Sequence, residues 1–233
     1  MASGGAELAT VSADGPPDPA ALGARRPDDL SRPASVQPGE YPVVLGPAAV
    51  AAALEALRRI PHGGGHRVAA PNVNLSDSPR FPSTLPRSYD AEGMPRQPSP
   101  LIQDGVTVAS PPPGRAEAVG GPAVLDHLVL VGGGAADIAE LAAPIDEGLY
   151  LPTLLTVRGW STAVAEPVLI RDGALLDQDT MSVRLALDVF ALLKAVQALT
   201  STQWTIPTGD RSARTAGATV CPAMRVGGGL RVL

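Results

Sequence analysis

Several residue types are scarce in this chain, and each scarcity excludes something. Aromatic residues make up only 3% of the 233 positions, so the core has to be built from Ala, Val and Leu. Burial of one Val or Leu side chain contributes about 1.5–3 kcal/mol. The single cysteine, Cys221, excludes an internal disulfide and is typical of a reducing compartment. No apolar run reaches the roughly 20 residues that a membrane-spanning helix needs.

Charged residues are also few, at 18% of the chain, with a net charge of −5 and Lys194 as the only lysine. No block of Lys and Arg is present, so the electrostatic signature of a nucleic-acid-binding protein is missing. Residues 1–38 lack a cationic stretch followed by an apolar one, which argues against a secretory signal. We therefore expect a cytoplasmic protein with neither a nucleic-acid nor a membrane partner.

The chain divides into a tail and one domain. Residues 1–38 are small, polar and Pro-rich and cannot bury enough apolar surface to offset the entropy of ordering, so they predict a disordered tail. Residues 39–233 mix apolar strand-like and helix-like segments without strict alternation. This pattern indicates an α+β domain with a mixed, largely antiparallel sheet and packed helices.

The first half of the domain predicts a strand over 41–45 and then a helix that begins near Pro47. Val50, Leu54 and Leu57 share one face of that helix, which ends at Pro61. Residues 61–100 show no periodicity and predict a long loop. The Asp104-Gly105 pair that follows is a strong hairpin signal between two short apolar segments.

The second half predicts further elements: strands over 125–131, 149–157, 167–170 and 218–226, and helices over 135–143 and 182–199. The helix over 182–199 is the clearest, because its Leu and Val residues recur at helical spacing. Asp172-Gly173 predicts a second tight turn.

Short motifs occur along the chain in a recognisable order. They run Tyr41-Pro-Val-Val-Leu-Gly-Pro47, Ser88-Tyr-Asp-Ala-Glu-Gly-Met-Pro-Arg-Gln97 with Leu101-Ile-Gln-Asp-Gly-Val106, Glu147-Gly-Leu-Tyr-Leu151, Val168-Leu-Ile-Arg-Asp-Gly173 and Cys221-Pro-Ala-Met-Arg-Val226. Together they resemble the C-terminal domain of the TldD/PmbA family, also called the modulator of DNA gyrase family. The resemblance implies that family's C-terminal fold over about residues 40–228.

In the catalytic branch of that family, a central helix carries His-Glu-x-x-x-His, and a cysteine near the C-terminus completes a zinc site. The matching positions here are Glu55 and Ile60 for the histidines and Ala56 for the glutamate. The chain therefore looks similar to the TldE/PmbA-type subunit, which lacks the motif. The resemblance implies no catalytic residue and no cofactor in this chain, a TldD-like catalytic partner that carries the zinc, and an unfolded peptide substrate such as a modified natural-product precursor.

Three other residues could be considered as metal ligands. His62 and His66 are spaced by four, but Pro61 and three intervening glycines oppose a helix there, so a flexible loop is the better interpretation. Cys221 is offset from the family's ligand cysteine, and a lone cysteine is commonly a buried small hydrophobic residue.

The family resemblance places the segment around Tyr89 along the substrate channel. We therefore take Tyr89, Asp90, Glu92, Gly93 and Gln97 as candidate peptide-contacting residues, with strand addition as the mode of binding. Two alternatives remain open: a stand-alone peptide-binding or scaffold protein that has lost the protease context, and an independent enzyme that uses His62, His66 and Cys221.

Overall fold

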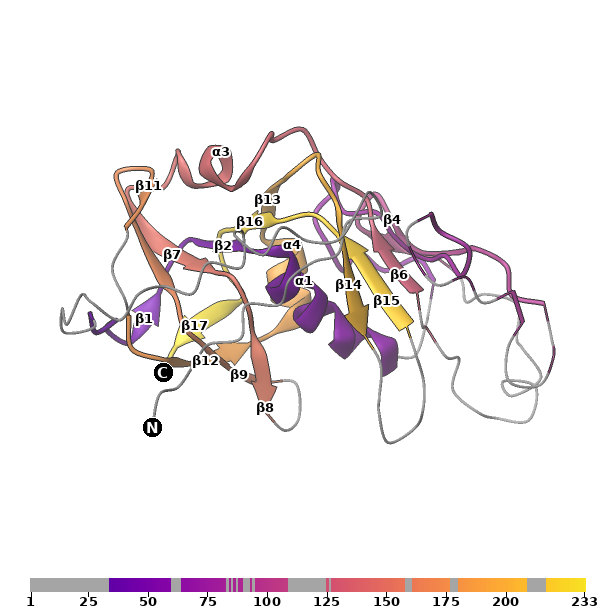
Figure 1. Ribbon diagram of the computed structural model, residues 1–233, viewed down its shortest axis with the longest axis horizontal. Coiled ribbons are helices and arrows are strands. Elements are labelled where there is room, and N and C mark those ends of the chain that lie inside the picture. Colours follow the sequence, from indigo (N-terminus) through magenta and orange to yellow (C-terminus); the bar gives the residue numbers. More distant parts are fainter. Residues whose placement is uncertain are drawn as a thin grey trace, which may run out of the picture.

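The computed structural model describes most of the chain after the first 33 residues. The described residues are 34–59, 64–82, 84, 86, 88–89, 93, 95–108, 125, 127–157, 161–176, 180–208 and 217–233. Within them the chain forms three β-sheets and a few short helices (Figure 1). No helix in this part of the chain is long and apolar enough to cross a membrane.

The first sheet has five strands and contains the last strand of the chain. Its order is β1 (Gly39–Glu40), β17 (Leu230–Val232), β12 (Val183–Leu187), β9 (Thr162–Ala165) and β8 (Leu155–Val157). All neighbours in this sheet run antiparallel.

The second and third sheets have six strands each. The second is ordered β11 (Ala174–Leu175), β10 (Val168–Arg171), β7 (Glu147–Leu151), β2 (Val43–Leu45), β16 (Met224–Val226) and β13 (Val196–Leu199). The third is ordered β14 (Trp204–Thr208), β15 (Gly217–Cys221), β6 (His127–Leu130), β3 (Leu75–Asp77), β4 (Ser99–Gln103) and β5 (Val106–Thr107). Among the described strands, only the β2–β7 and β6–β15 pairs are parallel. The predicted α+β class with a largely antiparallel sheet is confirmed.

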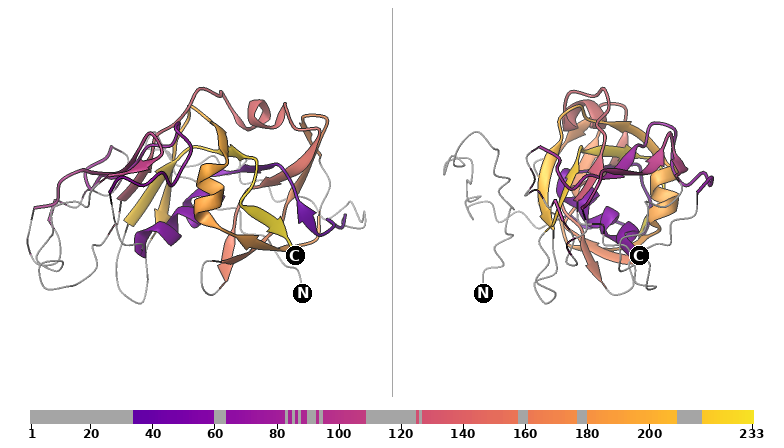
Figure 2. Two further views of the ribbon diagram at one scale, coloured as in Figure 1. Left: turned by 180° about the vertical axis from the view of Figure 1, so that it is seen from behind. Right: turned by 90° about the vertical axis from the view of Figure 1, so that its right-hand side faces the viewer.

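One helix lies at the centre, where the three sheets meet. Helix α1 (Pro47–Leu54) contacts β8 of the first sheet, β2 of the second, and β14 and β15 of the third. The strands surround it when the molecule is viewed end-on (Figure 2). Ala49, Val50, Ala51, Ala53 and Leu54 are all at most 1% exposed. A helix that is apolar on every side has to be enclosed, so its Ala-rich sequence explains its place in the core.

The predicted start of α1 is confirmed, and its end differs slightly. Pro47 occupies the first turn, where a missing N–H costs nothing. After Leu54 the chain tightens into a 3-10 helix, η1 (Glu55–Arg59), which keeps Leu57 buried as predicted.

Both predicted Asp-Gly turns are present. Asp104 and Gly105 have φ values of 47° and 77° and join β4 to β5, while Asp172 and Gly173, at 49° and 77°, join β10 to β11. Positive φ at both central positions is the geometry that favours Asp-Gly in two-residue hairpins.

The predicted helix over 182–199 is wrong. The segment forms β12, then a short helix α4 (Val189–Lys194), then β13. The carboxylate of Asp188 accepts hydrogen bonds from the amides of Phe190 and Ala191, both at 3.0 Å, and so caps a helix that starts only at residue 189. The apolar stripe satisfied both patterns, because Val183, Leu185 and Leu187 alternate with less buried residues as a strand requires.

Four other segments also differ from prediction. Residues 149–157 contain two strands, β7 and β8, which lie in different sheets. Residues 218–226 likewise divide at Pro222, with β15 in the third sheet and β16 in the second. The predicted loop over 61–100 contains β3, and the predicted helix over 135–143 shortens to α3 (Ile138–Ala142), capped by the carboxylate of Asp137.

Candidate functional site

The family resemblance matches the end of the central helix to the zinc-binding motif of the catalytic branch. The positions matching the first histidine and the glutamate, Glu55 and Ala56, lie in η1 directly after α1. Ala56 is 8% exposed and is part of the apolar core. Ile60 lies outside the described residues. Alanine and isoleucine offer no lone pair to a metal, so these positions do not fit a zinc ion.

Cys221 lies beside the first turn of α1 and is completely buried. Its thiol donates a hydrogen bond to the carbonyl oxygen of Pro47, with Sγ and O 3.2 Å apart. Burial raises the pKa of the Cys221 thiol from 9.0 to about 12, although a backbone hydrogen bond from Ala51 opposes the rise. Metals and electrophiles react with the thiolate, so a thiol held in this state is poorly suited to either.

The two described metal candidates are separated in the fold. His66 is exposed, and its backbone pairs with Thr107 of β5, donating to Thr107 Oγ1 at 3.1 Å and accepting from Thr107 N at 2.8 Å. Cys221 lies on β15, and β6, β3 and β4 separate it from β5. Four strand spacings amount to about 19 Å along the sheet, far beyond a shared coordination sphere. His62 lies outside the described residues.

No group of three or more His, Cys, Asp or Glu side chains that could hold a metal ion occurs within the described ranges. We expect that this chain binds no metal of its own. Because that expectation also covers residues outside the described ranges, it stays a prediction.

The candidate peptide-contacting segment folds back on itself at the end of the third sheet. Tyr89 and Pro95 form an antiparallel bridge, and the amide of Arg96 donates to the carbonyl of Ser88 at 2.9 Å. Gly93 has a φ of +79°, consistent with a turn between the two arms. Tyr89 is 62% exposed, an unusually open position for an aromatic ring.

Of the other residues proposed for this site, Gln97 and Gly93 are exposed, whereas Asp90 and Glu92 lie outside the described residues. The structure therefore places Tyr89, Gly93 and Gln97 on one short, outward-facing segment. Their role in peptide binding stays a prediction.

A buried ion pair fixes the base of this segment to the third sheet. Nη2 of Arg96 lies 2.8 Å from Oδ2 of Asp77, and their side chains are only 11% and 8% exposed. Oδ1 of Asp77 accepts a hydrogen bond from the amide of His127 at 3.0 Å. Desolvation nevertheless raises the pKa of Asp77 above its usual value of 3.8, against the lowering effect of Arg96. The desolvation of the Asp77 carboxylate therefore outweighs the stabilisation that Arg96 and His127 give to its charged form.

Sequence reasoning missed Asp77. The residue belongs to a stretch without periodicity, and nothing local marks it as buried or as the partner of a residue 19 positions away. The only available signal was Arg96 itself, which lies within the motif around Tyr89.

The three sheets around an enclosed central helix can now be compared with known proteins. Residues 38–110 match the family described as the PmbA/TldA metallopeptidase C-terminal domain. The resemblance predicted from the sequence motifs is therefore confirmed at the level of that domain.

Solved structures support the same assignment. The chain superposes with a TM-score of 0.68 on TldE from Thermococcus kodakarensis, at 18% identity over 86% of this chain and 52% of that one. A putative modulator of a DNA gyrase from Thermotoga maritima gives a TM-score of 0.68 at 16% identity, over 86% of this chain and 51% of that one. A putative modulator of DNA gyrase from Bacteroides thetaiotaomicron also gives 0.68, at 17% identity over 86% and 49%.

At these identities the likeness shows the fold. The chain spans about half the length of the solved structures it matches. No curated protein sequence matches it significantly.

Proposed function

We propose that this chain is the non-catalytic, TldE/PmbA-like subunit of a heteromeric zinc metallopeptidase that degrades or trims unfolded peptides. A TldD-like partner supplies the zinc, the activated water and the glutamate base. Both subunits work in the cytoplasm, and modified natural-product precursor peptides are the substrate class that we would test first.

The observation that carries the proposal is the chemistry of the zinc-helix positions. Where the catalytic branch needs two histidines and a glutamate, this chain has Glu55, Ala56 and Ile60. The only cysteine near the C-terminus is buried, and its thiol is held by Pro47 O. An open zinc site needs about three ligands around a water position, and these residues do not provide them.

The partnership is tested by co-expression with a TldD-like protein that carries His-Glu-x-x-x-His. We expect the two chains to elute together in size-exclusion chromatography and to cleave an unfolded peptide, whereas this chain alone cleaves none. Separate elution, with full cleavage by the partner alone, would favour the stand-alone binding or scaffold protein instead.

Cys221→Ala gives a matched test of the non-catalytic role. We expect the variant complex to keep its activity and zinc, because a buried thiol bonded to a carbonyl is no ligand. Loss of zinc from a folded Cys221→Ala complex would instead support the independent enzyme that uses the histidines and Cys221.

Substrate contact by the segment around Tyr89 is tested with Tyr89→Ala. The ring is 62% exposed, so its removal leaves the core intact, and we expect a severalfold weaker capture of peptide by the complex. Met181→Ala serves as the control, because Met181 is a similarly exposed apolar residue at 55%. Equal capture by both variants would remove Tyr89 from the binding site.

A further inference from the structure

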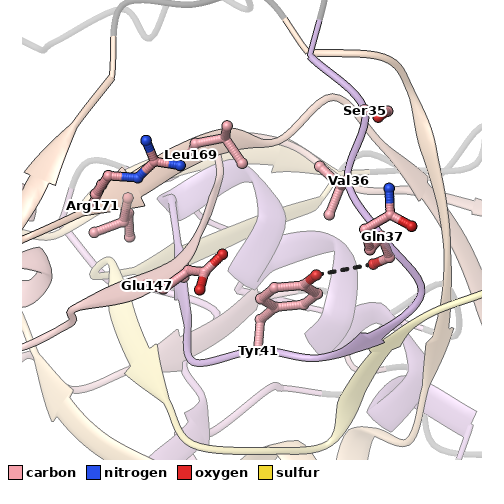
Figure 3. A pocket seen from close by; sticks show the side chains of 9 residues that line it. Ser35, Val36, Gln37, Tyr41, Glu147, Leu169 and Arg171 are labelled. Atoms are coloured by element: carbon pink, nitrogen blue, oxygen red, sulfur yellow. Dashed lines mark hydrogen bonds between the residues drawn. The ribbon is translucent and has the colours of Figure 1, made fainter.

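A small cavity lies at the end of the molecule away from β5, between the second sheet and the segment that precedes β2 (Figure 3). Its volume is about 120 Å³. One wall consists of the paired strands β7 and β10, and the other of Ser35–Gln37 with Tyr41. The hydroxyl of Tyr41 donates to the carbonyl of Gln37 at 3.0 Å and so holds the second wall in its curve.

Part of the cavity lining is apolar. Val36, Tyr41 and Leu169 line it, and all three are half-buried side chains that pack against the main hydrophobic core. A four-carbon branched side chain suits this space, since an apolar cavity of about 150 Å³ accommodates benzene.

Two opposite charges flank the apolar part. Glu147 and Arg171 are directly opposite each other on β7 and β10, so their side chains project from the same face of the sheet. In Figure 3 the carboxylate of Glu147 points towards Tyr41, and the guanidinium of Arg171 points towards Leu169. Neither side chain forms a hydrogen bond or ion pair with another residue in the described part of the chain.

Gly148, the next residue along β7, also lines the cavity. A Cβ there would lie 2.6 Å from both Ile145 Cγ2 and the carbonyl oxygen of Pro42. No side chain can occupy that position, and the strand next to the charged pair therefore stays close to the segment before β2.

We propose that this cavity binds a free α-amino acid with a branched aliphatic side chain, such as leucine. The side chain fills the space between Val36, Tyr41 and Leu169. The ammonium group pairs with the carboxylate of Glu147, and the carboxylate pairs with the guanidinium of Arg171, which can accept it in a bidentate geometry. The proposal is independent of the peptidase role, so its failure leaves that role untouched.

The test is titration calorimetry of the full chain with L-leucine, glycine, 4-methylpentanoate and 3-methylbutylamine. We expect leucine to bind with a Kd of about 0.1–1 mM. Glycine lacks the apolar group and each of the other two compounds lacks one charge, so all three bind at least about fivefold more weakly. No saturable binding of leucine up to about 20 mM, or binding of 4-methylpentanoate as tight as that of leucine, would overturn the proposal.

Variants test the two charges separately. Glu147→Gln and Arg171→Gln are exposed substitutions that keep the shape of the cavity, and each should weaken leucine binding about three- to tenfold. Glu166→Gln and Arg184→Gln remove the same charges from exposed positions that do not line the cavity and should leave binding unchanged. Equal binding by all four variants would overturn the assignment.

Discussion

At the scale of single residues, two chemically capable side chains, Cys221 and Asp77, are buried. Cys221 and Asp77 both have pKa values raised by desolvation. The offset of Cys221 from the family's ligand cysteine already favoured a buried residue there, whereas no sequence pattern marked Asp77. Unfolding measurements on each residue test whether its environment in solution is as buried as the structure shows.

The thiol of Cys221 should make stability depend on alkaline pH. Its folded pKa of about 12 lies above the unfolded value of 9.0, so its stabilising contribution is complete below pH 9 and is lost as pH rises towards 12. Each pH unit in that window lowers the free energy of unfolding by about 1.4 kcal/mol.

Denaturant unfolding of the wild type and Cys221→Ala at pH 8 and pH 10 measures this effect. The Ala variant lacks the thiol, so the wild type should lose about 1.4 kcal/mol more than the variant between the two pH values. Parallel losses in both proteins would mean that the thiol ionises in the folded state, as an accessible ligand would.

The Asp77–Arg96 pair should show strong coupling. Arg96→Met leaves a buried carboxylate without its cation and should cost about 3–5 kcal/mol. Adding Asp77→Asn removes the charge, keeps an oxygen for the amide of His127, and should recover at least about 1 kcal/mol of that loss. A double-mutant cycle by denaturant unfolding gives the coupling, and strictly additive effects would show that the pair is solvated.

At the scale of elements, the sequence predicts turns better than long periodic segments. Asp104-Gly105 and Asp172-Gly173 were predictable because positive φ at two successive positions restricts the residue types that fit. The structure of residues 182–199 was not predictable in this way. Leu185, Val189 and Leu192 have helical spacing, but the cap at Asp188 separates a strand before it from a short helix after it. Whether residues 183–187 form a strand or a helix depends on contacts with β17 and the loop before it, which lie more than 30 residues away in the sequence.

The candidate site was predictable in outline only. The family motifs located the central helix and the segment around Tyr89. The bridge from Tyr89 to Pro95 and the ion pair from Arg96 to Asp77 required tertiary structure. Strand β3, which carries Asp77, is only three residues long and gives no periodic signal.

Glycine at 229 should be indispensable for the contact between α4 and the loop before β17. Its φ is +85°, and a Cβ there would lie 2.2 Å from the backbone nitrogen of Leu192. Gly229→Ala should therefore cost more than about 3 kcal/mol, from both strain and overlap. Gly65→Ala is the control, since φ is +87° with nothing within 4 Å, and it should cost only about 1–2 kcal/mol. Similar thermal unfolding of the two variants would contradict this role for Gly229.

At the scale of the whole molecule, three sheets enclose a helix that is apolar on every side. The solved structures of the same fold are about twice as long as this chain. Under the proposed function, catalysis belongs to a separate subunit, and this chain would help to shape a shared chamber.

The zinc content of the complex and of each separated chain, measured by inductively coupled plasma mass spectrometry, tests the division of labour between the subunits most directly. We expect about one zinc per complex, all of it retained by the TldD-like partner, with none in this chain. Stoichiometric zinc in the isolated chain would instead assign the chemistry to this subunit.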